Sequence, residues 1–279
     1  MSFTKVTLTP EILQKTLYTF QGEALDTQRI TSFHKFSFYV FANPAYISDP
    51  RIQFTAQLDI TALYQNYLEK YKVSEKITFA TFVKWLAIKT MNNTPFLWRQ
   101  INGLWYQFNN LPLEVTMRTK KRRELELYVL ENVSNATWEQ FCQYHEDYKN
   151  GKYPDLLSAV TDLPIHWTAY QILNVHLPKM TSYNTTERVY YAHQPWIVFS
   201  DRYEQNGKLY LPFYMNYSHA TLTPEDVEDF IKNFLANGIL APDQVIEKTK
   251  QLSGTRALEA PKEEKPTKPQ EPSPDDLPF

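Results

Sequence analysis

The chain is poor in the residues and runs on which several classes of protein depend. It has one cysteine, Cys142, in 279 residues, which excludes an intrachain disulfide and a metal site built on several cysteines. A net charge of −2 provides no overall positive field to attract nucleic acid or an anionic membrane. No apolar run reaches the roughly 20 residues of a membrane-spanning helix, and the first residues lack the apolar stretch of a secretory signal. We therefore expect a soluble protein of the reducing cytoplasm.

Motifs of several common chemistries are also missing. The sequence has no glycine-rich phosphate loop and no G-x-S-x-G nucleophile elbow. Its six histidines fall in no metal-ligand spacing such as H-x-x-x-H, so we expect no metal site. Cys142 lies beside Phe141 on an expected helix, which is more typical of a structural residue than of a nucleophile.

The patterns that are present predict a globular α/β protein with 43% hydrophobic and 15% aromatic residues. Strands outnumber helices and several are joined by hairpins, as at Asn102–Gly103, so we expect a two-layer sandwich with helices on one face of a mixed, largely antiparallel sheet. Expected strands include 33–41, 51–61, 111–118 and 124–132, and expected helices include 60–72, 78–92, 137–149 and 225–236.

Composition divides the chain into four parts. We expect an N-terminal extension over residues 1–30, the main domain over 31–240 and a short helical segment over 241–254. Residues 255–279 are rich in proline, glutamate and lysine and offer little to bury, which is typical of a disordered tail.

One histidine stands at a distinctive junction. Apolar residues alternate along the segment that starts at Lys208 and predict a strand with one buried face. Thr223 and Pro224 then give the cap and first residue of a helix. His219 lies between the two elements, where its side chain can stand free of the sheet while the backbone around it is held rigid. This is a suitable position for a general base.

From about Phe33 to Leu235 the chain resembles the chloramphenicol acetyltransferase family of trimeric, acetyl-CoA-dependent O-acyltransferases. The likeness lies in the order and spacing of its segments, which are FHKFSFYVF (similar to the family's first strand), QLDIT with the helix 78–91, NTPFLWRQINGLWY, LEVTM, WEQFCQYHEDY and the strand pair before His219. It implies the family's two-layer fold, a homotrimer with active sites at subunit interfaces, and acetyl-CoA as co-substrate.

The resemblance also implies roles for individual residues. His219 matches the family's catalytic base, which takes the proton of a substrate hydroxyl. The family places a second histidine before it and Asp-Gly after three further residues, whereas this chain has Ser218 and Thr223-Pro224 there. Thr161 matches the serine that stabilises the oxyanion, and a threonine hydroxyl can still donate that hydrogen bond.

In the family, the aspartate of the signature pairs with an arginine near the first strand. Lys35 is the best match for that arginine, and it keeps the charge without the planar fork. With Thr223 opposite, we expect its anion to be Glu225 or Asp226, or its charge to be left to water.

Two charged segments allow further interpretations. The basic run Arg118–Arg123 could contact phosphates, including those of CoA, or nucleic acid, or it could be a solvated hairpin end balanced by Glu124 and Glu126. The tip Asp275, Asp276, Leu277, Pro278 and Phe279 resembles the acidic tip of bacterial single-stranded DNA-binding proteins, which implies docking to replication or repair proteins. The chain does not resemble the oligonucleotide-binding barrel of those proteins, so we expect no direct contact with nucleic acid.

Two functions remain open at this point. The first is acetyl-CoA-dependent O-acetyl transfer to chloramphenicol or another hydroxyl acceptor, favoured by His219 and Thr161. The second is a catalytically degenerate trimeric scaffold whose tail docks to partners, favoured by the replaced signature residues.

Overall fold

A mixed sheet forms the centre of the computed structural model, which describes residues 9–43, 45–47, 50–92, 95–118, 125–152, 168–177, 180 and 193–255. In this part of the chain seven strands make the sheet in the order β2-β10-β8-β7-β5-β6, with β9 paired to β10. Only the β5–β7 and β7–β8 pairs are parallel. The strands are β2 (Arg51–Asp59), β5 (Leu113–Arg118), β6 (Leu125–Leu130), β7 (Tyr170–Asn174), β8 (Trp196–Phe199), β9 (Tyr203–Gln205) and β10 (Lys208–Ser218).

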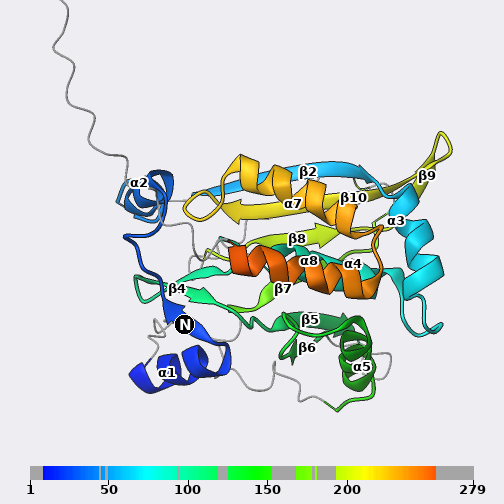
Figure 1. The fold of residues 1–279 in the computed structure, drawn as a ribbon, viewed down its shortest axis with the longest axis horizontal. Helices are drawn as coiled ribbons and strands as arrows, with labels where there is room; N and C mark the ends of the chain where they lie inside the picture. The colour runs from blue at the N-terminus through cyan, green and yellow to red at the C-terminus, as the bar shows by residue number, and fades with distance from the viewer. Residues whose placement is uncertain are drawn as a thin grey trace, which may run out of the picture.

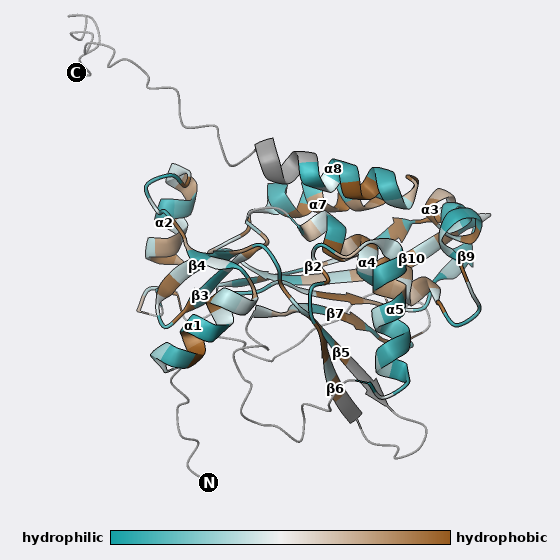
Figure 2. Cartoon of the chain, turned by 60° about the horizontal axis from the view of Figure 1, so that its bottom comes forward, coloured by the Kyte–Doolittle hydropathy of each residue, from teal (hydrophilic) through white to brown (hydrophobic). Residues whose placement is uncertain are grey.

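Helices cover one face of this sheet (Figure 1). The covering layer consists of α4 (Phe79–Met91), α7 (Pro224–Asn237) and α8 (Pro242–Thr255). Figure 2 shows α7 and α8 above the strands from a second direction. The short α3 (Thr61–Asn66) with the π-turn η1 (Tyr67–Tyr71), and α5 (Trp138–Lys149), stand at one end of the molecule. The expected two-layer α/β architecture is therefore confirmed.

A small antiparallel sheet and two helices form the opposite end. Its strands β1 (Gly22–Ala24), β4 (Leu104–Phe108) and β3 (Trp98–Ile101) pair in that order. The expected turn between β3 and β4 is confirmed, because Asn102 and Gly103 both adopt positive φ, at 51° and 81°. Helices α1 (Pro10–Thr19) and α2 (Ser32–Val40) flank this sheet.

Helix α2 replaces the strand expected over 33–41, so that expectation was wrong. The side chain of Thr31 accepts a hydrogen bond from the backbone N–H of His34 and caps the helix. His34, Phe38 and Phe41 follow at helical spacing, and the rings of His34 and Phe38 both pack on Trp98. The aromatic residues favoured a strand by propensity alone, but tertiary packing of one helical face decides the structure.

The expected helix 60–72 is present with an altered end. Its last five residues form the π-turn η1, in which Tyr67 and Tyr71 take the buried positions. Leu68, which follows Tyr67 directly, is 42% exposed. The wider turn changes the angle between successive residues, which moves Leu68 outward.

The core contains a lysine without a carboxylate partner. Lys89 on α4 is 4% exposed, and its Nζ donates hydrogen bonds to the carbonyls of Ser134 at 2.7 Å and Val133 at 3.4 Å. Burial and, to a smaller extent, repulsion by Lys250 together lower the pKa of Lys89 to about 7. Protons bound by this lysine in the unfolded chain are therefore lost on folding between about pH 7 and its ordinary pKa.

No helix in the described residues is long and apolar enough to cross a membrane.

The Lys89→Met variant should remove this pH dependence. In the wild type, the free energy of unfolding should rise with pH from about 7 upward, with a contribution from Lys89 of up to about 1.4 kcal/mol per pH unit, because the unfolded chain binds the additional proton. Urea unfolding between pH 6 and 9.5 would measure both slopes. Lys15→Met, at an exposed position of α1, should keep the wild-type slope, and equal slopes for wild type and Lys89→Met would contradict the assignment.

Candidate functional site

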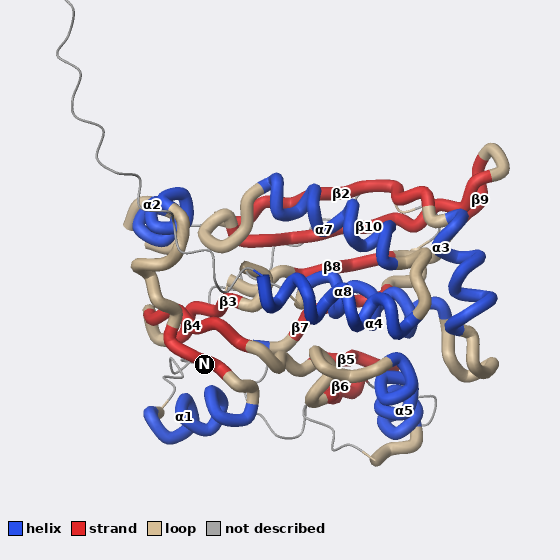
Figure 3. The backbone as a smooth tube through the Cα atoms, in the orientation of Figure 1, coloured by secondary structure: helices blue, strands red, loops and turns tan. Residues whose placement is uncertain are grey.

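The candidate site is the turn at the end of β10 (Figure 3). β10 lies between β2 and β8, and its ladder with β2 runs to the pair Ser218–Arg51. The N–H of His219, the next residue, still donates to the carbonyl of Pro50 at 2.8 Å. The sheet thus holds the backbone of His219, while the side chain lies beyond the last residue pair.

Helix α7 holds the other side of this turn. Thr223 caps the helix through a reciprocal capping box, in which its hydroxyl accepts from the N–H of Asp226 and the Asp226 carboxylate accepts from the N–H and hydroxyl of Thr223. The predicted strand, cap and helix around His219 are therefore confirmed, but the expectation of one buried face was wrong, because every residue of β10 from Leu211 to Ser218 is buried. Five residues separate the end of β10 from the start of α7, and the last of them is the cap Thr223, so the turn has little freedom.

The hydrogen bonds of His219 define which ring nitrogen is free. Its Nδ1 lies 3.2 Å from the carbonyl oxygen of Leu222. A carbonyl only accepts, so Nδ1 carries the proton and Nε2 keeps its lone pair. Nε2 has no hydrogen-bond partner among the described residues. This is the tautomer that a general base requires at Nε2.

Helix α2 builds an aromatic wall beside His219. The ring of Phe41 lies 4.6 Å from the imidazole and that of Phe33 lies 5.8 Å from it, measured between ring centroids. His34 fixes the helix to the turn, since its Nε2 donates to the carbonyl of Thr221 at 3.2 Å. His219 is half-buried as a result, with one side of its ring covered by apolar groups.

His193 forms a second hydrogen-bond network, which holds Ser218 directly before the turn. Nδ1 of His193 lies 2.7 Å from Ser218 Oγ, and Nε2 of His193 lies 3.1 Å from Gln100 Oε1. Because the amide oxygen accepts, Nε2 of His193 carries the proton, and Ser218 donates its hydroxyl to Nδ1. Ser218 Oγ also accepts from the N–H of Ala220 at 3.2 Å. Burial lowers the pKa of His193 to about 4, so this histidine stays neutral near pH 7.

Sequence reasoning missed this network. Gln100 lies 93 positions before His193, and Ser218 lies 25 positions after it. The one local sign is visible only in the structure, where His193 adopts a positive φ of 55°. Such a conformation is uncommon for a residue other than glycine.

Of the alternatives expected for Lys35, the structure has exposure to water and not an ion pair with Glu225 or Asp226. Its Nζ donates to the backbone carbonyl of Gln28 at 3.1 Å on the exposed face of α2. The Asp226 carboxylate is used in the cap of α7, and no ion pair joins Lys35 to Glu225 or Asp226. The family's ion pair thus has no equivalent in these residues, and the helical form of 32–40 is the reason, since it directs Lys35 away from the turn.

Several expected site residues lie outside the described residues. They are Thr161, residues 119–123 of the basic run, and Asp275, Asp276, Leu277, Pro278 and Phe279. In the described ranges, no three His, Cys, Asp or Glu side chains are grouped so that they could hold a metal ion. Cys142 is buried on α5, and burial raises the pKa of its thiol to about 12, which suits the structural role predicted for it.

His219 in the turn and His193 beside it should show opposite tautomers. In a ¹⁵N-histidine NMR spectrum near pH 7, we expect the Nδ1–H form for His219 and the Nε2–H form for His193, because each proton faces an oxygen that only accepts. His193 should remain neutral as the pH falls until about pH 4. His219→Gln and His193→Gln assign the signals. An Nε2–H tautomer at His219 would contradict the proposed geometry.

Comparisons with known proteins identify the fold of this chain, but no sequence family matches it. No protein-family model matches the chain, and no curated protein matches its sequence. A solved chloramphenicol acetyltransferase is similar in structure, with a TM-score of 0.63 and 14% sequence identity over 77% of this chain and 98% of that one. The cubic core of a pyruvate dehydrogenase multienzyme complex matches with a TM-score of 0.51 and 14% identity, over 88% of this chain and 94% of that chain.

A third match is the dihydrolipoamide acetyltransferase of Azotobacter vinelandii, with a TM-score of 0.52 and 14% identity over 81% of this chain and 93% of that one. Two of these three structures are acetyltransferases by name, and the third is the core of a pyruvate dehydrogenase complex. This chain therefore has the acyltransferase fold of chloramphenicol acetyltransferase.

Proposed function

We propose that this protein is an acetyl-CoA-dependent O-acetyltransferase of the cytoplasm that uses His219 as general base. The observation that carries the proposal is the bond from Nδ1–H of His219 to the Leu222 carbonyl, which leaves Nε2 ready to accept a proton at the end of the central strand. The acceptor is chloramphenicol or another hydroxyl compound.

The proposed reaction needs two proton transfers at Nε2. The acceptor hydroxyl binds to Nε2, and its oxygen attacks the carbonyl carbon of the acetyl thioester while its proton moves to His219. The tetrahedral intermediate then collapses, the carbon–sulfur bond breaks, and the CoA sulfur takes the proton from Nε2. The Leu222 carbonyl accepts from Nδ1–H throughout and so stabilises the transient imidazolium. Thr161 is our candidate for the donor to the oxyanion.

Two further points support this assignment. The Azotobacter vinelandii structure belongs to an investigation of the roles of a serine, a histidine and an asparagine in the mechanism of an acetyltransferase, which agrees with a histidine and a hydroxyl as the working pair. The aromatic wall of Phe33 and Phe41 limits water beside the base. We also propose a homotrimer with sites at its interfaces, following the family resemblance.

Loss of the base should abolish activity. We expect His219→Ala to reduce acetyl-CoA-dependent thiol release by about 10²–10⁴-fold, the usual contribution of general base catalysis. The assay is release of free thiol from acetyl-CoA with chloramphenicol and a panel of hydroxyl acceptors. Lys35→Ala should retain wild-type turnover, because Lys35 contacts only the Gln28 carbonyl and makes no ion pair at the turn.

The outcome separates the two functions. Equal turnover in wild type and His219→Ala would exclude His219 as the base. No turnover with any acceptor would favour the second candidate, a catalytically degenerate trimeric scaffold. That candidate is favoured by one observation, namely that Ser218 and Thr223 stand where the family has functional residues and are here occupied with local hydrogen bonds.

The tail provides a separate test of the scaffold. We propose that Asp275–Phe279 docks to replication or repair proteins that bind the tips of single-stranded DNA-binding proteins, with the Phe279 ring filling a pocket. Deletion of Phe279 should abolish capture of such a partner in a pull-down with purified proteins, while Lys262→Ala, in the same tail, should not change it. Undiminished capture after the deletion would refute the docking proposal and leave the acetyltransferase proposal untouched.

A further inference from the structure

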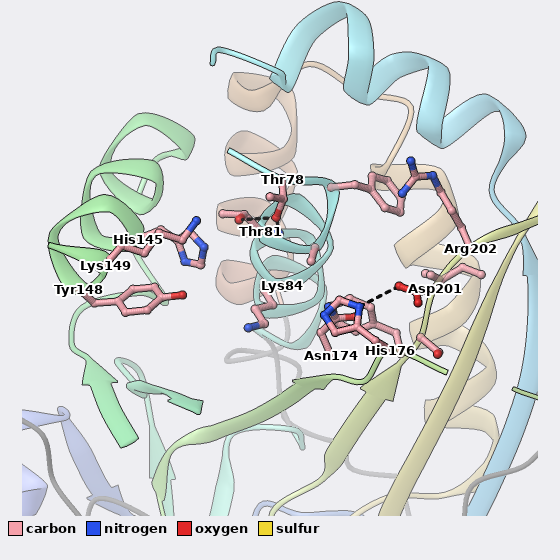
Figure 4. A pocket seen from close by; sticks show the side chains of 15 residues that line it. Thr78, Thr81, Lys84, His145, Tyr148, Lys149, Asn174, His176, Asp201 and Arg202 are labelled. Carbon is pink, nitrogen blue, oxygen red and sulfur yellow. Dashed lines mark hydrogen bonds and ion pairs between the residues drawn. The ribbon is translucent and has the colours of Figure 1, made fainter. Parts of the chain in front are cut away.

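A second site lies at the other end of the sheet from His219. A pocket of about 350 Å³ opens where α4 and α5 meet the carboxyl ends of the parallel strands β7 and β8 (Figure 4). Leu211, near the start of β10, lines this pocket. His219 follows eight residues later along the same strand, which corresponds to a separation of about 26 Å. The pocket therefore does not belong to the proposed base.

Positive groups dominate the lining. Lys84, Lys149 and Arg202 all border the pocket, whereas Asp201 is the one carboxylate among its described lining residues. Asp201 is itself engaged, since its Oδ1 lies 3.0 Å from Nδ1 of His176, as Figure 4 shows. The cations thus exceed the carboxylates by two.

Neutral groups hold two of these cations. Nζ of Lys149 donates to the carbonyl of Lys76 at 3.2 Å. Arg202 donates to the hydroxyl of Tyr64 at 2.9 Å and lies over the Tyr64 ring, 4.4 Å from its centroid. Neither interaction neutralises the charge, so both cations still attract an anion into the pocket.

Lys84 and His145 are the strongest signs of a missing ligand. Lys84 is 9% exposed and has no hydrogen bond or ion pair among the described residues. Burial and, to a smaller extent, repulsion by Lys149 together lower the pKa of Lys84 to about 8. His145 is 5% exposed, and its Nδ1 is buried without a hydrogen-bond partner. Buried polar groups are normally satisfied, so the unpartnered Nδ1 of His145, beside a pocket that Lys84 also lines, indicates an absent ligand.

The remaining lining residues fit a ligand that has both an anionic and an apolar part. Helix α4 begins at the pocket with Thr78 as its cap, and the positive end of its dipole faces the cavity. Burial raises the pKa of Tyr148 to about 12, so its hydroxyl stays protonated and can donate. Phe199 and Leu211 add apolar surface. A bare inorganic anion would leave that surface and much of the volume unused.

We propose that this pocket binds a small organic phosphate monoester. The dianionic phosphate lies against Lys84 and His145 at the start of α4, with Lys149 and Arg202 at the sides. The organic part rests on the apolar wall of Phe199 and Leu211. The two excess positive charges match a phosphate dianion better than a carboxylate. The proposal does not depend on acetyl transfer at His219.

Calorimetric titration of the full chain with phenyl phosphate tests this site. We expect saturable binding to the wild type and at least a tenfold weaker affinity for Lys84→Met, since the variant removes the central ammonium and keeps a similar volume. Lys15→Met and His219→Ala should bind as the wild type does. Thermal unfolding with and without the probe confirms that each variant is folded and shows whether the ligand stabilises it.

Titrations with further compounds show which part of the ligand the pocket recognises. Phenol, which lacks the phosphate, should not bind, and inorganic phosphate should bind more weakly than phenyl phosphate. Coenzyme A and dephospho-coenzyme A distinguish the source of the phosphate, because preference for coenzyme A that is lost in Lys84→Met assigns its phosphate monoester to the pocket. Absence of binding by every phosphate probe, or equal affinity in wild type and Lys84→Met, would overturn the proposal.

Discussion

The pairing of β10 on both of its edges is the constraint on which the candidate site depends. Nine residue pairs join this strand to β2, from Tyr210–Asp59 to Ser218–Arg51, and four join it to β8. The register of the ladder therefore sets where the strand stops and which residue first leaves it. A slip of one residue would turn every side chain to the opposite face, and the burial of Phe213, Met215 and Tyr217 in the core opposes such a slip. The position of His219 is thus a property of the whole sheet and not of its turn.

Three buried cationic side chains of this protein form no ion pair with a carboxylate among the described residues. Lys89 is satisfied by two backbone carbonyls, and Arg99, which is 0% exposed, donates to the carbonyls of Phe96 and Trp98. Both lie in the core, where Nζ of Lys89 and Nη1 of Arg99 have backbone acceptors, although Nε and Nη2 of Arg99 have no hydrogen-bond partner among the described residues. Lys84 is buried to a similar extent on the same helix as Lys89, yet it found none among the described residues. The difference is the pocket beside it, which is why we assign Lys84 to ligand binding and the other two to structure.

Local signals in the sequence were enough for the elements that carry His219. Alternating apolar residues, the Thr223-Pro224 cap and the Asn102–Gly103 turn each act over a few residues, and each predicted its element correctly, although the strand is buried on both faces and not on one. The helix α2 was mistaken for a strand because its aromatic residues favour strands, and only their packing on Trp98 and Trp105 reveals the helix. The network of Gln100, His193 and Ser218 and the Lys84 pocket join distant segments, so no local pattern could have predicted them.

The turn around His219 is held by other hydrogen bonds, although the family's signature residues are replaced in this chain. Where the family resemblance implies an ion pair between the turn and a cation near the first strand, this chain closes the turn with its own hydrogen bonds. Thr223 and Asp226 satisfy one another at the start of α7, Ser218 binds the N–H of Ala220, and His34 reaches the Thr221 carbonyl from α2. Most of these are short-range or neutral contacts, which salt screens little. A turn that is rigid without the ion pair can still present Nε2 of His219 in one orientation, and orientation is what a general base requires of its scaffold.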